Sequence, residues 1–346
     1  MKKILQDLSF FELENLIEEW GEKKFRARQL YDGIMKGKKI SKINISPTLR
    51  ERLLEEYEDE PVKIIKTLTS SDGTEKYLFA LADGNIIEGV LMKYKYGNTQ
   101  CVSTQVGCRM GCKFCASTLG GLVRNLTSGE ILCQVLAVNS LHSADGKRGV
   151  TNVVLMGSGE PLDNFENTVT FLKNISAEGG IGISPRNVSL STCGIVPRIY
   201  ALADSGLPVN LTISLHQTSD EGRARTMPIA KKYSIAEILK ACEYYFEKTG
   251  RRYIFEYSLI EGENSDREHA EQLIKLLRGK PCHVNLIRLN EVKERTLKST
   301  TDKQAYAFLE ELSKGGLSAT VRRSMGADIG GACGQLRASY LKQEDN

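Results

Sequence analysis

Residues 107–115 read GCRMGCKFC and place three cysteines, Cys108, Cys112 and Cys115, on one short loop. Their spacing is C-x3-C-x2-C, and soft thiolates at such spacing bind zinc or an iron–sulfur cluster. A closed structural zinc site needs four protein ligands, and no second C-x2-C pair accompanies this loop in the sequence. Three thiolates on a four-iron cluster leave one iron open to a small molecule with an amine and a carboxylate group. We therefore expect an iron–sulfur centre with one open position.

The chain beyond this loop alternates apolar strand candidates with helical segments. We expect strands near residues 151–156, 187–192, 209–215, 252–259, 282–288 and 318–323. Such alternation predicts parallel strands joined by helical crossovers, and the number of units favours an α/β fold with a full or partial (β/α) barrel. Functional side chains should then lie at the carboxyl ends of the strands.

The chain before the loop has a different pattern. Its first 60 residues are expected to be helical, because Ser9 and Glu12 match a capping box and Ser46 precedes Pro47 at another helix start. Between residues 62 and 104, β-branched and aromatic residues surround turn signals at 71–73 and 83–84, which favours a small antiparallel meander. We expect an accessory domain over residues 1–95 and the barrel over residues 96–346.

Composition narrows the class of protein. The 346 residues are 41% hydrophobic, which is typical of a globular chain, and no run reaches the roughly 20 apolar residues that a membrane span needs. No signal-peptide core follows the charged N-terminus, so we expect a cytoplasmic protein with no membrane partner. In a reducing compartment nine cysteines are not expected to form a disulfide framework. Four without partner spacing are assigned to packing: Cys133, Cys193, Cys242 and Cys282.

Basic residues gather near the N-terminus although the net charge is only +4. Residues 21–52 hold ten Lys or Arg against three acidic residues. This excess suits a nucleic-acid partner, but a solvated helical face is at least as common a cause. The candidate phosphate contacts are Lys23, Lys24, Arg26, Arg28, Lys36, Lys38, Lys39 and Lys42.

The cysteine loop and several further motifs together resemble a known family. The C-x3-C-x2-C loop is the signature of radical S-adenosylmethionine (SAM) enzymes. The chain is similar over nearly its whole length to the RlmN/Cfr family of radical SAM RNA methyltransferases, through CVSTQVGC at 101–108, FCAST at 114–118, GSGEP at 157–161 and ACGQLR at 332–337. The FCAST and GEP motifs favour the dual-specificity RlmN branch, whereas Arg288, where that branch is expected to have Pro, is reminiscent of Cfr.

The resemblance implies a fold, cofactors and partners. It implies a βα barrel, a [4Fe–4S] cluster on Cys108, Cys112 and Cys115, and two molecules of SAM per turnover. The reduced cluster cleaves SAM to a 5′-deoxyadenosyl radical. The implied reaction is methylation of adenine C2 in 23S rRNA and in the tRNA adenosine beside the anticodon, with an electron donor such as flavodoxin.

The resemblance also implies the roles of three residues in that reaction. Cys333 takes a methyl group from the first SAM, and the radical from the second SAM removes hydrogen from this S-methyl group. The carbon radical adds to C2. Glu88 then accepts the C2 proton, and Cys101 attacks the sulfur, which leaves a transient Cys101–Cys333 disulfide.

Residues that contact SAM are implied in the same way. They follow successive strands, as expected for the functional face of a barrel: Gly159, Glu160, Ser191, Ser214, Leu215, His216 and Asn290. Without the resemblance, His216 is more readily interpreted as a hydrogen-bonded structural histidine, and Glu88 as a glutamate that faces solvent from a strand.

Three alternatives stay open at this point. The first is a Cfr-like methyltransferase that acts on adenine C8 of 23S rRNA. The second is a radical SAM enzyme with a non-RNA substrate, which would give Cys101 and Cys333 no role. The third is a zinc-stabilised RNA-binding protein that is not an enzyme.

Overall fold

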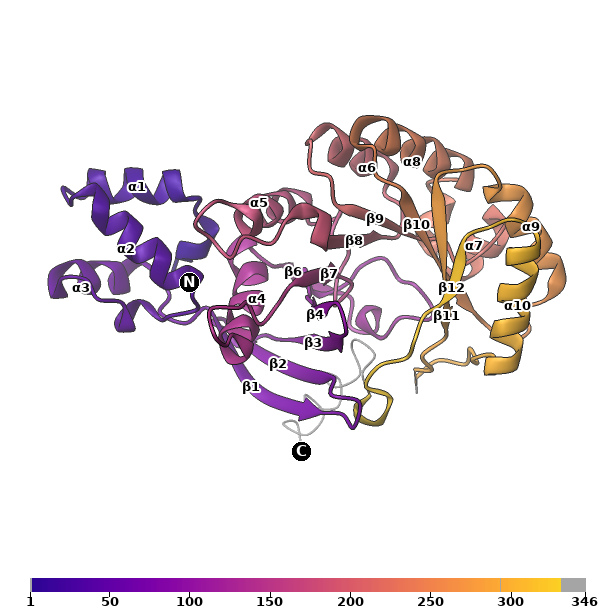
Figure 1. The fold of residues 1–346 in the computed structure, drawn as a ribbon, viewed down its shortest axis with the longest axis horizontal. Coiled ribbons are helices and arrows are strands. Elements are labelled where there is room, and N and C mark those ends of the chain that lie inside the picture. The colour runs from indigo at the N-terminus through magenta and orange to yellow at the C-terminus, as the bar shows by residue number, and fades with distance from the viewer. Residues whose placement is uncertain (1, 293, 331–346) are drawn as a thin grey trace.

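One mixed sheet forms the centre of the molecule (Figure 1). The computed structural model describes residues 2–292 and 294–330. The sheet has ten strands, which lie side by side in this order: β1 (Val62–Thr69), β2 (Glu75–Leu81), β3 (Ile86–Tyr94), β4 (Gly97–Cys101), β7 (Asn152–Leu155), β8 (Val188–Thr192), β9 (Asn210–Ser214), β10 (Tyr253–Leu259), β11 (Cys282–Arg288) and β12 (Ala319–Val321).

The strands from β7 to β12 are all parallel to their neighbours. Each lies within the range expected from the sequence, so the predicted β/α alternation is confirmed. Within the described part of the chain, β1 and β12 are the two edges of the sheet, and the barrel is therefore partial and open.

Helices cover the outer side of the curved sheet (Figure 1). The crossover helices are α4 (Ser128–His142), α5 (Phe165–Ser176), α6 (Val196–Asp204), α7 (Asp220–Thr226), α8 (Ile235–Thr249), α9 (Arg267–Leu277) and α10 (Asp302–Lys314). Strand β8 shows how the two faces differ, because Val188 and Leu190 are buried in the core while the alternate residues Ser189 and Ser191 are only partly buried. The apolar side of such a strand packs under the helices and leaves hydroxyl groups for the other side.

The predicted meander is present and belongs to the same sheet. Strands β1 to β4 pair antiparallel, with turns that pass through Gly73 and Gly84 at positive φ. Strand β4 then pairs parallel with β7, where Cys101 lies opposite Val154. Hydrogen bonding therefore continues across residue 95, where the boundary between accessory domain and barrel is expected.

The N-terminal residues form the expected helices, α1 (Phe10–Glu19), α2 (Lys24–Met35) and α3 (Pro47–Glu56). Ser9 and Glu12 make the predicted capping box, and Ser46 caps α3 with Pro47 in its first turn. Asp7 joins this unit to the core, since its carboxylate accepts hydrogen bonds from Ser128 Oγ at 2.8 Å and Gly129 N at 2.6 Å, at the start of α4. None of the helices described here is long and apolar enough to cross a membrane.

A two-stranded hairpin supports the cysteine loop from both ends. Strand β5 (Gln105–Gly107) precedes the loop and pairs antiparallel with β6 (Leu122–Asn125), which follows it. Gly107 has φ +78°, and a Cβ atom there would lie 2.0 Å from the carbonyl oxygen of Gly121. This position therefore requires glycine on two independent grounds.

Gly107→Ala tests this requirement. We expect it to lower the free energy of unfolding by about 2–4 kcal/mol, because a left-handed conformation and a backbone overlap each cost about 1–3 kcal/mol. Urea unfolding of the protein without cofactors, under reducing conditions, measures the change. Gly120→Ala is the control, since no atom lies within 4 Å of its Cβ position and its φ is not positive; a loss of equal size in both variants would contradict the argument.

Candidate active site

Hydrogen bonds close the turn that carries Cys112 and Cys115, and the amide of Cys108 donates to the carbonyl of Gly121 in the supporting hairpin. Cys108 and Cys112 are buried and Cys115 is partly exposed. The amide of Cys115 donates to the carbonyl of Cys112 at 3.2 Å, and the hydroxyl of Thr118 donates to the carbonyls of both residues, at 3.1 and 2.9 Å. The loop is thus a closed turn, and its thiols lie close enough for Cys115 to raise the pKa of both Cys108 and Cys112.

The surroundings of these thiols fit an iron–sulfur cluster. Burial raises the pKa of the Cys108 thiol to about 12 and raises that of Cys112 further, so a strong cation is needed to keep them as thiolates. Fully buried Arg223 lies close enough to Cys112 to lower its pKa in part, and its Nη1 has no hydrogen-bond partner among the described residues. A buried guanidinium of this kind suits a site that carries negative charge once thiolates are bound.

The donor set also distinguishes a cluster from a single ion. No three His, Cys, Asp or Glu side chains in the described ranges meet as they would around one metal ion. In a four-iron cluster each thiolate binds a different iron, so the sulfur atoms need not converge on one point. Cys108, Cys112 and Cys115 are the residues that would hold a [4Fe–4S] cluster here.

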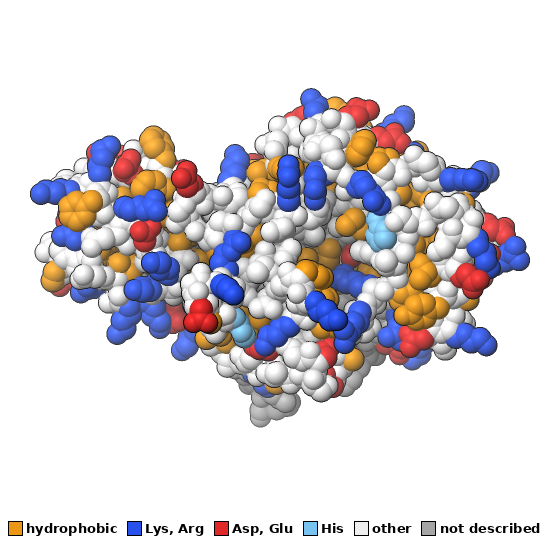
Figure 2. All heavy atoms as spheres, viewed as in Figure 1, with side chains coloured by type: hydrophobic (Ala, Val, Ile, Leu, Met, Phe, Trp, Pro, Cys, Tyr) orange, Lys and Arg blue, Asp and Glu red, His pale blue; other side chains and the backbone are white. Residues whose placement is uncertain are grey.

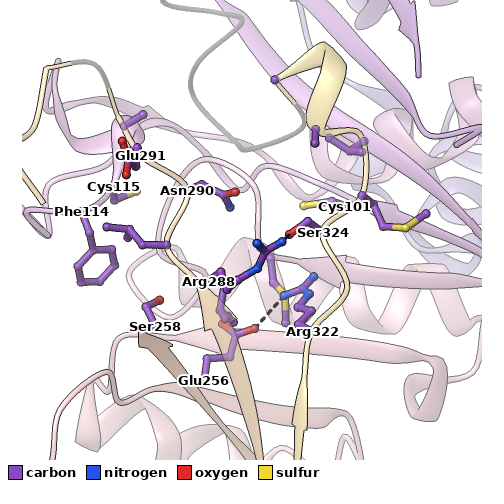
Figure 3. A pocket seen from close by; sticks show the side chains of 18 of the residues that line it. Cys101, Phe114, Cys115, Glu256, Ser258, Arg288, Asn290, Glu291, Arg322 and Ser324 are labelled. Atoms are coloured by element: carbon purple, nitrogen blue, oxygen red, sulfur yellow. Dashed lines mark hydrogen bonds and ion pairs between the residues drawn. The ribbon is translucent and has the colours of Figure 1, made fainter. Parts of the chain in front are cut away.

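A cavity of about 440 Å³ opens beside the cysteine loop. Figure 3 shows Phe114 and Cys115 on one side of it and Cys101 on the other. Asn290, from the segment after β11, also lines the cavity, as expected for a residue at the carboxyl end of a strand. Two cysteines with different implied roles therefore face one space.

An ion pair that the sequence analysis missed forms part of the cavity wall. Arg322 Nη1 lies 3.0 Å from Glu256 Oε1, and both residues line the cavity (Figure 3). Burial raises the pKa of the Glu256 carboxyl, and the Arg322 charge opposes that effect. A signal was available, because Glu256 is the one charged residue in the strand YIFEYSL at 253–259.

Gly159 and Glu160 follow β7 as expected, but the Glu160 carboxylate already has partners in the protein. It accepts hydrogen bonds from the amides of Cys193 at 2.7 Å and Leu162 at 3.0 Å, and burial raises its pKa. Gly159 has φ +109° and packs against Gln105, where a Cβ atom would lie 2.7 Å from the nearest atoms. These contacts fix the ends of β7 and β8 together, and contact of either residue with SAM remains a prediction.

His216 occupies a strained position between the cysteine loop and β10. Its φ is +58°, and its Nδ1 accepts a hydrogen bond of 3.0 Å from the amide of Ser258, a residue that lines the cavity. Burial lowers its pKa to about 3, so the ring is neutral and carries its proton on Nε2. The ring also meets Phe114 edge to face at 4.8 Å.

The remaining predicted SAM contacts lie just behind the cavity wall. Ser191 Oγ donates to Glu256 Oε2 at 3.3 Å and lies 3.5 Å from Ser214 Oγ. The amide of Leu215 donates to the carbonyl of Glu256. The structure thus brings these residues together at the carboxyl ends of β8, β9 and β10.

Glu88 does not face solvent. Its side chain is 3% exposed and forms an ion pair of 3.1 Å with Lys76, which is fully buried on β2. Strand alternation puts Glu88 on the same face of β3 as Val90 and Met92, which line the cavity, and Val90 lies opposite Cys101 in the sheet. Cys333, the implied methyl carrier, lies outside the described residues.

Lys and Arg side chains are spread over the N-terminal helices (Figure 2), and the eight basic candidates in this region differ in their partners. Some already have acidic partners: Lys24 pairs with Glu14 and Glu18, Arg28 with Asp32, and Lys39 with Glu60. Arg26 stacks on Phe25. The other four are exposed and make no ion pair with any residue in the described ranges: Lys23, Lys36, Lys38 and Lys42.

Comparison with known proteins identifies the family. Residues 102–277 match the radical SAM superfamily. The chain is 54% identical to a probable dual-specificity RNA methyltransferase RlmN of Clostridium perfringens over 99% of both chains, and 51% identical to one of Alkaliphilus oremlandii over 99% of this chain and 100% of the relative. A crystal structure of a radical SAM methyltransferase from Sphaerobacter thermophilus is 39% identical and matches with a TM-score of 0.92, over 96% of this chain and 98% of that one. The chain therefore belongs to the RlmN family of dual-specificity RNA methyltransferases within the radical SAM superfamily.

Proposed function

We propose that this protein methylates C2 of a specific adenine in 23S rRNA and in tRNA through an S-methylated Cys333. The observation that carries the proposal is the single cavity shared by Cys115 of the cysteine loop and by Cys101 (Figure 3), in a chain that matches RlmN relatives over its whole length. An enzyme that used the cluster alone would have no need of a second thiol on the opposite wall.

The reaction needs a radical route because adenine C2 lies between two ring nitrogens and is electron-poor. It cannot attack the methyl group of SAM as an ordinary nucleophile would. As a radical SAM enzyme the protein uses a [4Fe–4S] cluster and SAM, which together supply a 5′-deoxyadenosyl radical. Gly159, Glu160, Ser191, Ser214, Leu215, His216 and Asn290 are the proposed residues that orient SAM.

The protein side chains then complete the transfer from sulfur to carbon. The S-methylene radical of Cys333 adds to C2, and the adduct gives up one electron, for which the cluster would be the acceptor. Glu88 accepts the C2 proton. The Cys101 thiolate then attacks the Cys333 sulfur, the electron pair of the broken sulfur–carbon bond passes to the new carbon, and that carbon takes up a proton to become the methyl group. Cys101 is 5% exposed and lies beside Met156 and Met325. This apolar packing keeps bulk water away from the thiol while the adduct is present.

The cavity is large enough for a small-molecule ligand. A volume of about 440 Å³ lies in the usual range for small-molecule sites, which is roughly 300–1,000 Å³. An adenine in folded RNA reaches such a pocket only after it is unstacked or flipped out. The proposed partners are 23S rRNA, tRNA and an electron donor such as flavodoxin, with phosphates of the RNA held by the exposed lysines near the N-terminus.

Anaerobic turnover tests the reaction and its regiochemistry together. With SAM, a chemical reductant and an rRNA fragment or tRNA, we expect mass analysis of the digested RNA to give 2-methyladenosine. Cys333→Ala should abolish this product and leave the iron content unchanged. Formation of 8-methyladenosine would instead assign the Cfr-like activity, and normal product from Cys333→Ala would reopen the question of the substrate.

The lysine assignment predicts a change in salt dependence. Replacing Lys23, Lys36, Lys38 and Lys42 with Gln should weaken RNA binding, and the slope of log K against log salt should fall in magnitude by about 3, because each phosphate contact contributes about 0.7–0.9. Fluorescence anisotropy with a labelled RNA measures the slope.

The matched control replaces four exposed lysines on the outer helices, Lys173, Lys240, Lys275 and Lys303. These positions lie on α5, α8, α9 and α10, and the control should leave the slope unchanged. Equal slopes in the two quadruple variants would contradict the assignment of RNA contacts to the residues on either side of α2.

A further inference from the structure

The segment after β12 crosses the open side of the barrel and returns to the opposite edge of the sheet. Strand β12 is one edge of the sheet, while β1 and β2 lie at the other (Figure 1). Residues 322–330 run between these edges. Met325 packs against Val90, Met92 and Cys101, and Ala327 and Gly330 line the cavity.

The turn between β1 and β2 holds this segment through three hydrogen bonds. The amide of Gly326 donates to Asp72 Oδ2 at 3.0 Å, and the amide of Ser71 donates to Asp328 Oδ2 at 3.0 Å. The hydroxyl of Ser70 donates to the other Asp328 oxygen. These contacts join residues more than 250 positions apart in the sequence.

Lys76 makes the contact nearest the end of the described chain. Its Nζ donates to the carbonyl oxygen of Gly330 at 2.6 Å and lies 3.1 Å from Glu88 Oε2. One buried ammonium group therefore touches both the proposed proton acceptor and the last described residue. Because a buried charge without a partner is costly, these three groups are held together strongly.

The geometry of the segment is closely defined. Gly326 and Gly330 both adopt left-handed conformations, at φ +65° and +59°, on either side of a 3-10 turn at Ala327–Ile329. The hydrogen bonds from Gly326 and Thr74 hold the pKa of the Asp72 carboxyl well below its usual range, so Asp72 stays a charged acceptor at any ordinary pH.

The number of residues between Gly330 and Cys333 limits how far apart the two can lie. Cys333 follows Gly330 by three residues. An extended chain spans at most about 3.6 Å per residue, so Cys333 lies within about 11 Å of Gly330. Any movement of Gly330 therefore moves the region that the Cys333 sulfur can reach.

We propose that Asp72, together with Ser70 and Lys76 of the same hairpin, is a positioning residue that anchors the segment at 326–330 and so aims Cys333 into the cavity beside Cys101 and Glu88. This inference rests on the proposed function. Asp72 and Ser70 touch no reacting atom, and they act on the efficiency with which each radical is used for methyl transfer.

The test is the number of 5′-deoxyadenosine molecules formed for each methylated adenine. The variant Asp72→Ala should raise this ratio about tenfold over the unaltered protein, because loss of a charge-assisted hydrogen bond to a buried amide shifts a population by about that factor. The ratio does not depend on the fraction of folded enzyme, since both products come from the same active molecules. A purely structural role would lower both products and leave the ratio unchanged.

Two further variants make the result decisive. Asp328→Ala removes the partner of Ser70 and Ser71 from the segment side, and because Asp328 is exposed, its loss should not impair folding; it should raise the ratio as Asp72→Ala does. Asp83→Ala is the control. Asp83 lies in the next hairpin turn, between β2 and β3, where its carboxylate accepts a hydrogen bond from the amide of Asn85 and pairs with Arg124. It should leave the ratio unchanged.

The outcomes separate this inference from the proposed function. If the unaltered protein yields no methylated adenine, the proposed function fails. If it yields methylated adenine and both Asp72→Ala and Asp328→Ala keep its ratio, or if Asp83→Ala raises the ratio equally, the anchor is wrong while the function stands.

Discussion

Strand β4 pairs on one side with antiparallel β3 and on the other with parallel β7, and the arrangement of the site depends on this double pairing. Cys101 is its last residue, with Val90 opposite on one neighbour and Val154 on the other. The antiparallel pairing brings the face of β3 that carries Glu88 beside the carboxyl ends of the parallel strands. Without it, the meander would be a separate unit, and its glutamate and lysine would have no geometric relation to the cysteine loop.

Local signals in the sequence predicted most of this architecture. The C-x3-C-x2-C spacing, the capping box at Ser9 and the β/α alternation after residue 150 depend on neighbours in the chain, so they can be interpreted without tertiary information. The contacts of Asp72 with Gly326 and of Lys76 with Gly330 join residues 254 positions apart and leave no periodic trace. The pairing of Glu256 with Arg322 also joins residues far apart in the sequence, so it could not be predicted from local signals. The one charged residue in an apolar strand did indicate that Glu256 has a special role.

Several charged side chains around the site are buried. Glu88, Glu160 and Glu256 are each at most 6% exposed, and Arg223 and Lys76 are fully buried. Burial of an unpaired charge would cost several kcal/mol, so each of these groups has a fixed hydrogen-bond or ion-pair partner. Such partners orient the side chains before any substrate arrives, and the large apolar core under the helices offsets the cost of assembling them.

Residues 322–330 connect the two edges of the open barrel. A closed barrel has no free edges, whereas among residues 2–292 and 294–330 the sheet has β12 as its last strand. Residues 322–330 bridge the open side with side-chain and amide hydrogen bonds in place of a strand ladder. Such bonds fix the segment at a few points, which suits a site that must admit an RNA base. The open barrel and the hydrogen-bonded segment at 322–330 therefore depend on each other. Closure of the barrel by further strands would exclude the substrate, and without its anchor the segment would not limit the positions open to the Cys333 sulfur.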